Sequence, residues 1–275
     1  MKQILILTTA LEVIEQNLNS NIKTSDIAKA CYCSKSSLEK MFRCINDISV
    51  HDYILRRKMS LAAKEIHANP KTTLLDIALK FGYSSNEAFT RAFEQIWHCK
   101  PSTYRKQQKY YELYPRLLCP LENKNGDDYM ENRKHVDISE LYDLFQERKD
   151  CYFVCFDIVK LIPINEIART AGDLAILETL NRISSASGTE DITFRIGGDE
   201  FVLLTNSKDS SYAQQIAEQV AKQNGKPFTY EGKDIPLKLH ITTTKLENTK
   251  NYADLFTNLH TSIEHIISKS RSENM

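Results

Sequence analysis

The sequence lacks any long apolar run, and no stretch approaches the ~20 residues that a membrane-spanning helix requires. Residues 1–11 superficially resemble a signal peptide. Glu12 and Glu15 continue them as an amphipathic pattern, however, so we expect residues 4–18 to form the first helix of a folded domain. We therefore expect a cytoplasmic protein that does not contact a membrane.

The sequence also lacks the paired Cys-x-x-Cys units that are typical of a structural zinc site. It has seven cysteines, and Cys31 and Cys33 are separated by one residue without a matching pair elsewhere. An odd number of cysteines without a pairing pattern favours free thiols in a reducing cytosol, with a zinc site as the alternative.

The chain has no net charge, but its two parts differ in sign. Residues 1–116 contain 18 Lys and Arg against 11 Asp and Glu, a net charge of +7, and the remainder has a net charge of −7. The 275 residues are enough for two domains with full cores, and a hydrophobic content of 41% is ordinary for a soluble protein. A basic first part fits contacts with phosphates, whereas an acidic second part could repel DNA or hold a divalent metal.

Residues 76–93 have the pattern of a helix-turn-helix unit. Ile77 and Phe81 lie at helical spacing, Gly82 permits a tight turn, and Ser85 is a residue type that caps a following helix. A second apolar stripe then begins, with polar residues on the opposite face. A plain helical hairpin has the same apolar pattern, so this stretch alone does not distinguish the two.

A second copy of the pattern occupies residues 24–42, and Asp26-Ile-Ala in it matches Asp76-Ile-Ala fifty residues later. Residues 50–68 between the copies contain no Gly or Pro and are rich in helix formers, which predicts a rigid connector. Two recognition helices on such a connector can enter successive major grooves on one face of DNA, about 34 Å apart.

Residues 5–106 resemble the AraC/XylS-type transcription regulators. The resemblance rests on the two helix-turn-helix units, the connector that begins at Tyr53, the Phe-Thr-Arg-Ala-Phe core at 89–93 and the closing Lys-Pro-Ser-Thr-Tyr-Arg at 100–105. It implies an all-α domain with two helix-turn-helix units that binds double-stranded DNA sequence-specifically and regulates transcription. We place this domain at residues 1–116.

The resemblance also implies which side chains contact DNA. Arg91 could bridge a guanine and Asn86 could pair with adenine, whereas Glu39 and Glu87 could accept from cytosine but repel phosphate. Each of these could instead be a merely solvated helix position. Arg56, Arg57 and Lys58 on the connector are expected to be partly core-flanking and partly structural, and we do not assign them to DNA. The predicted DNA-binding residues are Lys35, Ser36, Ser37, Glu39, Lys40, Arg43, Asn86, Glu87, Thr90 and Arg91.

A linker rich in turn-forming and acidic residues is expected at 117–134, followed by a second domain at 135–275 that alternates strands and helices. The nearly continuous apolar run at 151–158 predicts a strand buried on both faces. This order predicts an α+β domain with an antiparallel-containing sheet covered by helices. Further strands are expected at 191–196, 201–205 and 235–244, and helices at 136–147, 165–184, 211–223 and 252–268.

An acidic hairpin joins two of these strands, with Gly197 and Gly198 followed by Asp199 and Glu200. Two glycines at a hairpin tip are an ordinary turn. Asp157, at the end of a neighbouring strand, could converge with Asp199 on Mg²⁺, which typically takes one or two carboxylates plus phosphate oxygens. Such a site would orient a triphosphate for phosphoryl or nucleotidyl transfer.

Residues 195–201 resemble the signature of GGDEF domains, the diguanylate cyclase family, and the wider match covers residues 152–269. This family condenses two GTP molecules into cyclic di-GMP, with one GTP on each domain of a dimer. The resemblance implies a nucleotidyl cyclase palm-type fold, Mg²⁺ on Asp157 and Asp199, and a homodimer formed through this domain. It implies catalytic roles for Asp199 and Glu200 and nucleotide binding by Asn165, Asp173, Gly197 and Gly198.

The chain departs from the GGDEF pattern at several positions. Leu161, Ile162 and Pro163 stand where the family has its phosphate-loop lysine, and Lys160 comes two positions early. The segment between Asn165 and Asp173 is one residue short and lacks the family's Gly-His, and the family's C-terminal motif is unrecognisable. The inhibitory Arg-x-x-Asp reads as residues 188–191, with Gly in place of Arg.

These departures decide which activity we expect. Losing one charge-stabilising donor costs a transferring phosphate site ~3 kcal/mol or more. We therefore expect a degenerate domain that binds a guanine nucleotide, GTP or a cyclic di-GMP-like molecule, as an effector, or that mediates dimerisation. The alternative is an active diguanylate cyclase gated by the DNA-binding domain.

Overall fold

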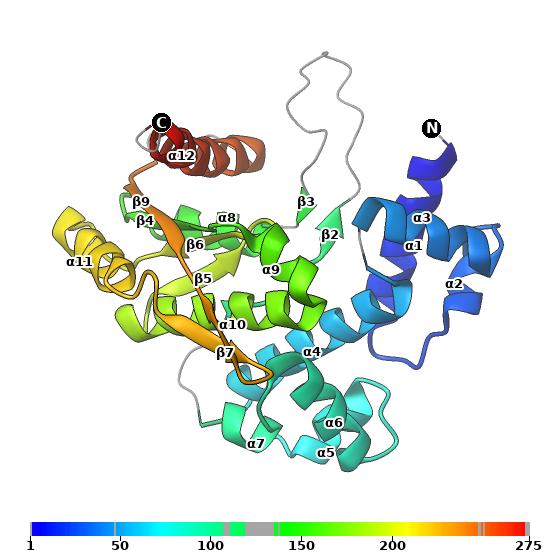
Figure 1. Ribbon diagram of the computed structural model, residues 1–275. Helices are drawn as coiled ribbons and strands as arrows, with labels where there is room; N and C mark the ends of the chain where they lie inside the picture. Colours follow the sequence, from blue (N-terminus) through cyan, green and yellow to red (C-terminus); the bar gives the residue numbers. More distant parts are fainter. Residues whose placement is uncertain are drawn as a thin grey trace. The chain divides into compact units, whose positions relative to one another are not determined.

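The computed structural model describes residues 2–46, 48–106, 111–118, 135–136, 138–246, 249 and 251–272. The chain divides into two compact units, Met1–Asp137 and Ile138–Met275, and Figure 1 shows the helices and strands of each. The predicted order of an all-α domain followed by an α+β domain is confirmed. Most of the predicted linker lies outside the described residues, and the residues at its two ends, β2 (Leu117–Leu118) and β3 (His135–Val136), pair antiparallel.

The first unit consists of helices, as the periodicity predicts. The residues expected to face inward from the first helix, Leu7, Leu11, Ile14 and Leu18, are all buried. A short strand, β1 (Tyr111–Glu112), follows the last helix. The helices are α1 (Lys2–Gln16), α2 (Thr24–Ala30), α3 (Lys35–Asn46), α4 (Val50–Ala68), α5 (Leu74–Lys80), α6 (Asn86–Trp97) and α7 (Pro101–Tyr104).

The two helix-turn-helix units, α2–α3 and α5–α6, have the same structure at an offset of fifty residues. Even single hydrogen bonds in their turns correspond. The Cys33 amide donates to the Ala28 carbonyl, and the Tyr83 amide donates to the Ala78 carbonyl, at 3.0 and 2.9 Å. The left-handed residue in the second turn is Gly82 (φ +78°), and the residue at the same place in the first turn is Tyr32 (φ +52°). The turn of the second helix-turn-helix unit thus has glycine, the residue type that this backbone conformation favours, whereas the turn of the first helix-turn-helix unit has tyrosine.

We expect Gly82→Ala to destabilise the first unit by about 2 kcal/mol or more. A side chain at positive φ costs roughly 1–2 kcal/mol, and an added Cβ would lie 2.9 Å from the Ser20 carbonyl carbon, a backbone atom that cannot swing away. Tyr32→Gly should instead stabilise the unit by about 0.5–1 kcal/mol, because the Tyr32 side chain is 98% exposed and no packing is lost. Urea unfolding followed by the fluorescence of the single tryptophan, Trp97, measures both. Equal effects of the two substitutions would contradict this account.

The second unit is a sheet with helices on both faces (Figure 1). Its four long strands lie in the order β5-β6-β4-β9, and each neighbouring pair is antiparallel. Helices α8 and α12 cover one face, and α10 and α11 cover the other. The elements are α8 (Ser139–Glu147), β4 (Phe153–Ile158), α9 (Leu161–Ile167), α10 (Arg169–Ala186), β5 (Ile192–Arg195), β6 (Glu200–Leu204), α11 (Ser210–Ala221), β7 (Pro227–Tyr230), β8 (Lys233–Pro236), β9 (Leu239–Thr244) and α12 (Tyr252–Ser272).

Two element boundaries in this unit differ from the prediction. The single helix expected at 165–184 is two helices, because Ala168 is extended (φ −166°, ψ 147°) and the hydrogen-bond ladder starts again after it. The strand expected at 235–244 is also divided. Pro236 ends β8, which forms a hairpin with β7 around the positive-φ Gly232, and β9 starts separately at Leu239.

The described part of the chain has neither a membrane span nor a disulfide. No described helix combines the length and the apolar content needed to cross a bilayer. The six described cysteines are free thiols, and the seventh, Cys119, lies outside the described residues. Burial raises the pKa of the Cys155 thiol to about 12, and the charge of Glu200 adds to this shift.

Candidate nucleic-acid interface and nucleotide site

The predicted DNA-contacting side chains lie on the solvent side of α3 and α6. Both helices begin at a serine cap: the Ser34 hydroxyl accepts from the Ser37 amide at 3.1 Å, and the Ser85 hydroxyl accepts from the Ala88 amide at 3.2 Å. Of the ten predicted residues, Glu39, Asn86 and Thr90 are half-buried, and the others are exposed: Lys35, Ser36, Ser37, Lys40, Arg43, Glu87 and Arg91.

The opposite face of α6 is anchored by aromatic packing. Phe93 stacks on Trp97 with ring centroids 5.9 Å apart, and Trp97 packs against Tyr104 of α7 at 4.8 Å. The Trp97 indole N–H donates to the Met59 carbonyl of α4 at 3.0 Å. Because one face of α6 is held against the connector in this way, the polar face that carries Arg91 is left toward solvent.

The basic residues of the connector are structural, as predicted. Arg57 is 5% exposed, and its guanidinium binds both carboxylate oxygens of Glu15, with Nε–Oε1 at 2.9 Å and Nη2–Oε2 at 3.0 Å. It also donates to the Tyr114 carbonyl at 2.6 Å. The Tyr53 hydroxyl donates to the same Glu15 carboxylate at 2.8 Å. Arg57 therefore links α1, α4 and the end of the helical unit.

Lys58 joins the two helix-turn-helix units to each other. Its ammonium group donates to the Ser20 carbonyl before α2 at 2.6 Å and to the Phe81 carbonyl at the end of α5 at 3.0 Å. Burial lowers the pKa of Lys58 and raises that of the neighbouring Tyr83 to about 12. This buried ammonium group therefore holds the connection before α2 against the end of α5.

Glu87 is a fixed negative charge at the start of α6. Hydrogen bonds from its own backbone amide and from Ser85 lower its pKa, and the charge of Arg91 adds to this shift. A carboxylate ionised at the helix N-terminus repels phosphate. The role of Glu87 in base selection stays a prediction.

In the second unit, the strand register places Asp157, Glu200 and His240 in one row on one face of the sheet. Asp157 of β4 is directly opposite Glu200 of β6 and directly opposite His240 of β9. Directly opposite residues project to the same side, and two carboxylates facing each other are destabilising unless a positive group compensates them. Asp157 and Glu200 are 8% and 6% exposed, so compensation is needed here.

His260 of α12 supplies a partner for Glu200. Its Nδ1 lies 2.9 Å from Glu200 Oε2, and the side chains of both residues are less than a tenth exposed. Phe256, one turn earlier in α12, packs against the imidazole with ring centroids 4.2 Å apart. The carboxylate of Glu200, the second acidic residue of the signature, is therefore bound to His260 in the interior of the second unit.

His260 is not among the residues predicted from the sequence. A signal was present, because the last helix has an apolar stripe at Leu255, Phe256, Leu259 and Ile263, and His260 falls on that stripe. A histidine at such a position is expected to be buried and to need a partner.

The two glycines of the turn differ in what surrounds them. A Cβ on Gly197 would lie 2.4 Å from the Glu200 carboxylate, so the position of Glu200 requires glycine there. A Cβ on Gly198 would meet nothing within 4 Å, and its backbone angle is not one that requires glycine. Arg195 holds the turn by donating to the carbonyls of both glycines. The backbone at Gly198 is thus open to a ligand.

Asn165 of α9, one member of the predicted guanine-binding pair, lies close to Gly172 of α10, the residue before the other member, Asp173. The Asn165 Oδ1 atom lies so close to Gly172 that an added Cβ would be 1.7 Å away. Asn165 is exposed and Asp173 is half-buried. The shortened segment between them therefore still places Asn165 beside the residue before Asp173.

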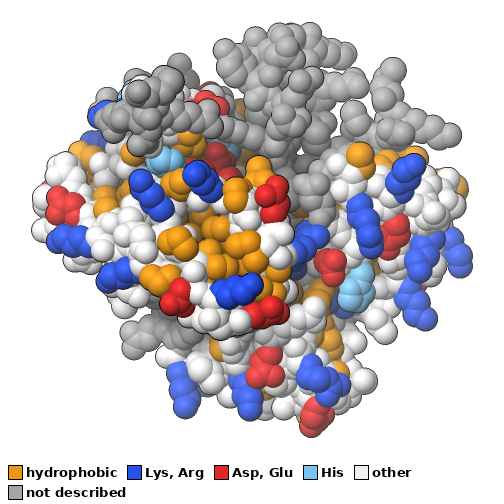
Figure 2. Space-filling view, in the orientation of Figure 1, with side chains coloured by type: hydrophobic (Ala, Val, Ile, Leu, Met, Phe, Trp, Pro, Cys, Tyr) orange, Lys and Arg blue, Asp and Glu red, His pale blue; other side chains and the backbone are white. Residues whose placement is uncertain are grey.

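The surface beside this pair is apolar. Ile162 and Ile167 of α9 are 71% and 56% exposed, and Figure 2 shows hydrophobic side chains gathered over this part of the second unit. Ile162 belongs to the three residues that replace the phosphate-loop lysine. Lys160 is exposed at the turn before α9, in a left-handed conformation.

The segment that corresponds to the inhibitory motif, residues 188–191, is held in place by hydrogen bonds to Asp191. The Asp191 carboxylate accepts from the Gly188 amide at 2.7 Å, the Asn206 amide at 2.9 Å and the Tyr212 hydroxyl at 2.6 Å. A Cβ on Gly188 would lie 2.7 Å from the Tyr212 oxygen. An arginine at position 188 would therefore require Tyr212 to move.

Of the two predicted metal residues, Asp157 lies in β4 and Asp199 lies in the turn just before β6. The Ile158 amide, next to Asp157, donates to the Asp199 carbonyl at 3.0 Å, so the turn lies beside the end of β4. Among the described residues, no group of three or more His, Cys, Asp or Glu side chains is arranged to hold a metal ion. A two-carboxylate magnesium site completed by phosphate oxygens would need only Asp157 and Asp199.

Comparison with known proteins matches each unit to a family. A model of helix-turn-helix domains matches residues 27–107, and the model of the diguanylate cyclase GGDEF domain matches residues 131–273, more than half of the chain. The Transposon Tn10 TetD protein of Escherichia coli is 34% identical over 100 residues, which are 36% of this chain and 71% of TetD. The regulatory protein SoxS of Salmonella typhimurium is 32% identical over 100 residues, 36% of this chain and 92% of SoxS.

Two further similar proteins are matched over a smaller part of their length or with a looser structural likeness. The chain spans 50% of the putative HTH-type transcriptional regulator YkgA of Escherichia coli, with 32% identity over 122 residues, 43% of this chain. A sensory box/GGDEF family protein of Caulobacter crescentus has 18% identity and a TM-score of 0.41, over 48% of this chain and 88% of that one. The chain belongs to the AraC-type helix-turn-helix regulators in its first unit and to the GGDEF family in its second.

Proposed function

We propose that the first unit binds duplex DNA sequence-specifically through α3 and α6. The proposal is supported by the repeat of the two helix-turn-helix units and by Lys58, which binds the Ser20 carbonyl before α2 and the Phe81 carbonyl at the end of α5. The net charge of +7 over residues 1–116 supplies attraction to phosphates. Arg91 and Asn86 on α6 supply direct base recognition, because their side chains can form paired hydrogen bonds with guanine and adenine.

We expect Arg91→Ala to weaken specific binding by about 1–3 kcal/mol and to relax the preference at one base position. Arg91→Lys is the matched control: it keeps the charge and should keep non-specific affinity, but it cannot form the bidentate contact and should lose the preference. The measurement is fluorescence anisotropy of the full chain on duplexes selected from a random pool. An unchanged base preference in both variants would remove Arg91 from the interface.

For the second unit, we propose that it binds a guanine nucleotide as an effector and does not turn it over. Three features support binding: the approach of Asn165 to Gly172, the open backbone at Gly198, and Asp157 and Asp199 at the same end of the sheet. The observation that argues against turnover is the engagement of Glu200 by His260 in the interior. The exposed Ile162 in place of a cationic phosphate donor argues in the same direction.

The test is titration of the full chain with GTP and with cyclic di-GMP in the presence of Mg²⁺, together with a search for newly formed cyclic di-GMP. We expect binding without product. Gly198→Ala should weaken binding by about tenfold without loss of stability, since its Cβ meets no protein atom but would meet a ligand. Asn165→Ala should weaken binding similarly. Formation of cyclic di-GMP that disappears in Asp199→Ala would instead establish an active diguanylate cyclase.

For regulation, the nucleotide must favour one DNA-binding state of the chain over another. The chain could do this as a homodimer formed through the second unit, as its resemblance to GGDEF domains suggests. DNA affinity measured with and without saturating nucleotide tests this link. An identical affinity in both conditions would leave the second unit a dimerisation module only.

A further inference from the structure

Strand β9 is an edge strand of the sheet of the second unit, and within the described residues of this unit it pairs only with β4. Its backbone groups alternate in direction. The Lys238 carbonyl accepts from the Val159 amide, 2.9 Å away on the β4 side. The amide and the carbonyl of the next residue, Leu239, point the other way and bond to the Asn224 side chain at 2.8 and 2.9 Å.

This alternation identifies which peptide groups face outward. Because Leu239 faces outward, Ile241 and Thr243 do so too, whereas Thr242 faces β4. No hydrogen bond among the described residues uses the outward groups of Ile241 or Thr243. The side-chain amide of Asn224 makes the two hydrogen bonds that a neighbouring strand would make with Leu239. The outward amide and carbonyl groups of Ile241 and Thr243 could pair with a further strand.

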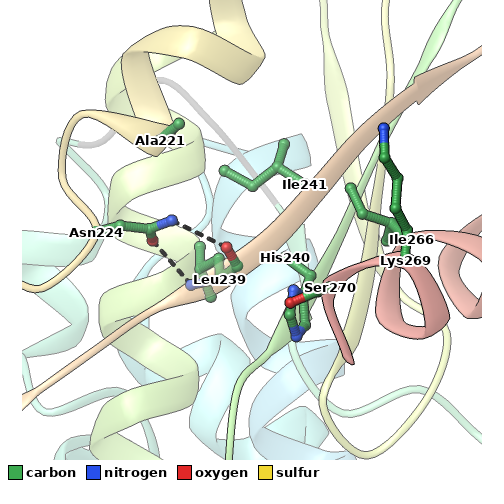
Figure 3. A pocket seen from close by; sticks show the side chains of 8 residues that line it. All are labelled: Ala221, Asn224, Leu239, His240, Ile241, Ile266, Lys269 and Ser270. Atoms are coloured by element: carbon green, nitrogen blue, oxygen red, sulfur yellow. Dashed lines mark hydrogen bonds between the residues drawn. The ribbon is translucent and has the colours of Figure 1, made fainter. Parts of the chain in front are cut away.

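A pocket lies at the Leu239–Ile241 end of this edge. Figure 3 shows a pocket of about 330 Å³ that has β9 on its floor, Ala221 and Asn224 at the end of α11 on one side, and Ile266 and Lys269 in the last turns of α12 on the other. A strand added to a sheet edge places its side chains alternately on the two faces of the sheet. Side chains on one face would then contact the end of α11, and those on the other face would contact α12.

The edge lacks the features that keep sheet edges from pairing. Natural edge strands carry charges, prolines or bulges that prevent association. Residues 239–244 read Leu-His-Ile-Thr-Thr-Thr, with no Lys, Asp, Glu or Pro, and Lys238 and Lys245 stand only at the ends. Among the outward backbone groups of Leu239, Ile241 and Thr243, only those of Leu239 are blocked, by the Asn224 side chain.

We infer that β9 pairs antiparallel with β9 of a second copy of this chain. With Leu239 blocked, a two-fold axis at Thr242 is the register that uses all open groups: Ile241 of each copy faces Thr243 of the partner subunit, and four backbone hydrogen bonds form. The strand is uncharged, so this pairing brings no like charges opposite each other. The paired β9 strands form the interface of the dimer proposed above, and their pairing does not require bound nucleotide.

The register gives a direct test by cross-linking. Directly opposite residues that do not exchange hydrogen bonds have Cα atoms about 4.5 Å apart, within the range that a disulfide spans. Thr242→Cys in the full chain should therefore form an intermolecular disulfide under mild oxidation, identified by mass spectrometry of the linked peptide. Thr244→Cys is the control, since its two copies would lie about 14 Å apart along the strands and should not cross-link.

A second variant tests the hydrogen bonds without a cysteine. Thr243→Pro removes an outward amide that is not used within the sheet, which edge strands tolerate, and should convert the dimer to a monomer in sedimentation equilibrium without nucleotide. Thr243→Val keeps the amide and should remain dimeric. A monomeric unmodified chain, a dimer that survives Thr243→Pro, or cross-linking by Thr244→Cys and not by Thr242→Cys would overturn the inference, whatever the outcome of the nucleotide titration.

Discussion

Arg57→Ala is expected to destabilise the first unit by about 3 kcal/mol or more, because it leaves the Glu15 carboxylate in a largely buried position without its cation. The Arg57 and Glu15 side chains are only 6% and 13% exposed, and the guanidinium also satisfies the Tyr114 carbonyl. Trp97 fluorescence isolates this effect, since the only tryptophan lies in the first unit. The midpoint of urea unfolding should fall without a change in slope.

Two comparisons separate the ion pair from the loss of side-chain packing. Arg56→Ala removes the neighbouring cation, which lies 4.6 Å over the Tyr114 ring, and should cost about 0.5–1 kcal/mol. The double variant Glu15→Gln with Arg57→Met removes both charges and should recover much of the loss, because no unpaired charge is left. A loss for Arg57→Ala as small as that for Arg56→Ala would show that the pair adds no stability.

His260→Ala is expected to destabilise the second unit by about 3 kcal/mol, because the Glu200 carboxylate would then stand buried opposite Asp157 without the imidazole that lies 2.9 Å from it. Tryptophan fluorescence does not report on this unit, so hydrogen exchange of the β4 and β6 amides is the appropriate measurement. Protection in these strands should fall, while that in the first unit stays unchanged.

A double-mutant cycle establishes that the effect belongs to the pair. Glu200→Gln combined with His260→Ala should cost less than the sum of the two single substitutions, since the carboxylate that needs compensation is absent. Additive costs would mean that His260 stabilises the unit by packing against Phe256 alone. If His260→Ala also gave the chain diguanylate cyclase activity, release of Glu200 from the interior would be sufficient for turnover.

The features read correctly from the sequence are those that local spacing determines. The helix-turn-helix units follow from apolar positions at helical spacing and from the glycine and serine between them, and the fifty-residue repeat made the pattern specific. The strand at 151–158 was evident because a strand buried on both faces is a continuous apolar run. Errors occurred where one backbone residue decides the outcome, as at Ala168 between α9 and α10.

The sequence by itself determined the helical and α+β character of the two units, the recognition helices and the acidic turn, because each is encoded within a few turns or a single hairpin. Only the tertiary structure decided that Glu200 is held by His260, sixty residues later, that Lys58 joins the two helix-turn-helix units, and that Asn224 blocks the outward backbone groups of Leu239 in β9. Each of these depends on a buried or edge polar group finding a partner distant in the chain. Such partners are selected by geometry and by the cost of leaving the group unsatisfied, which no local pattern records.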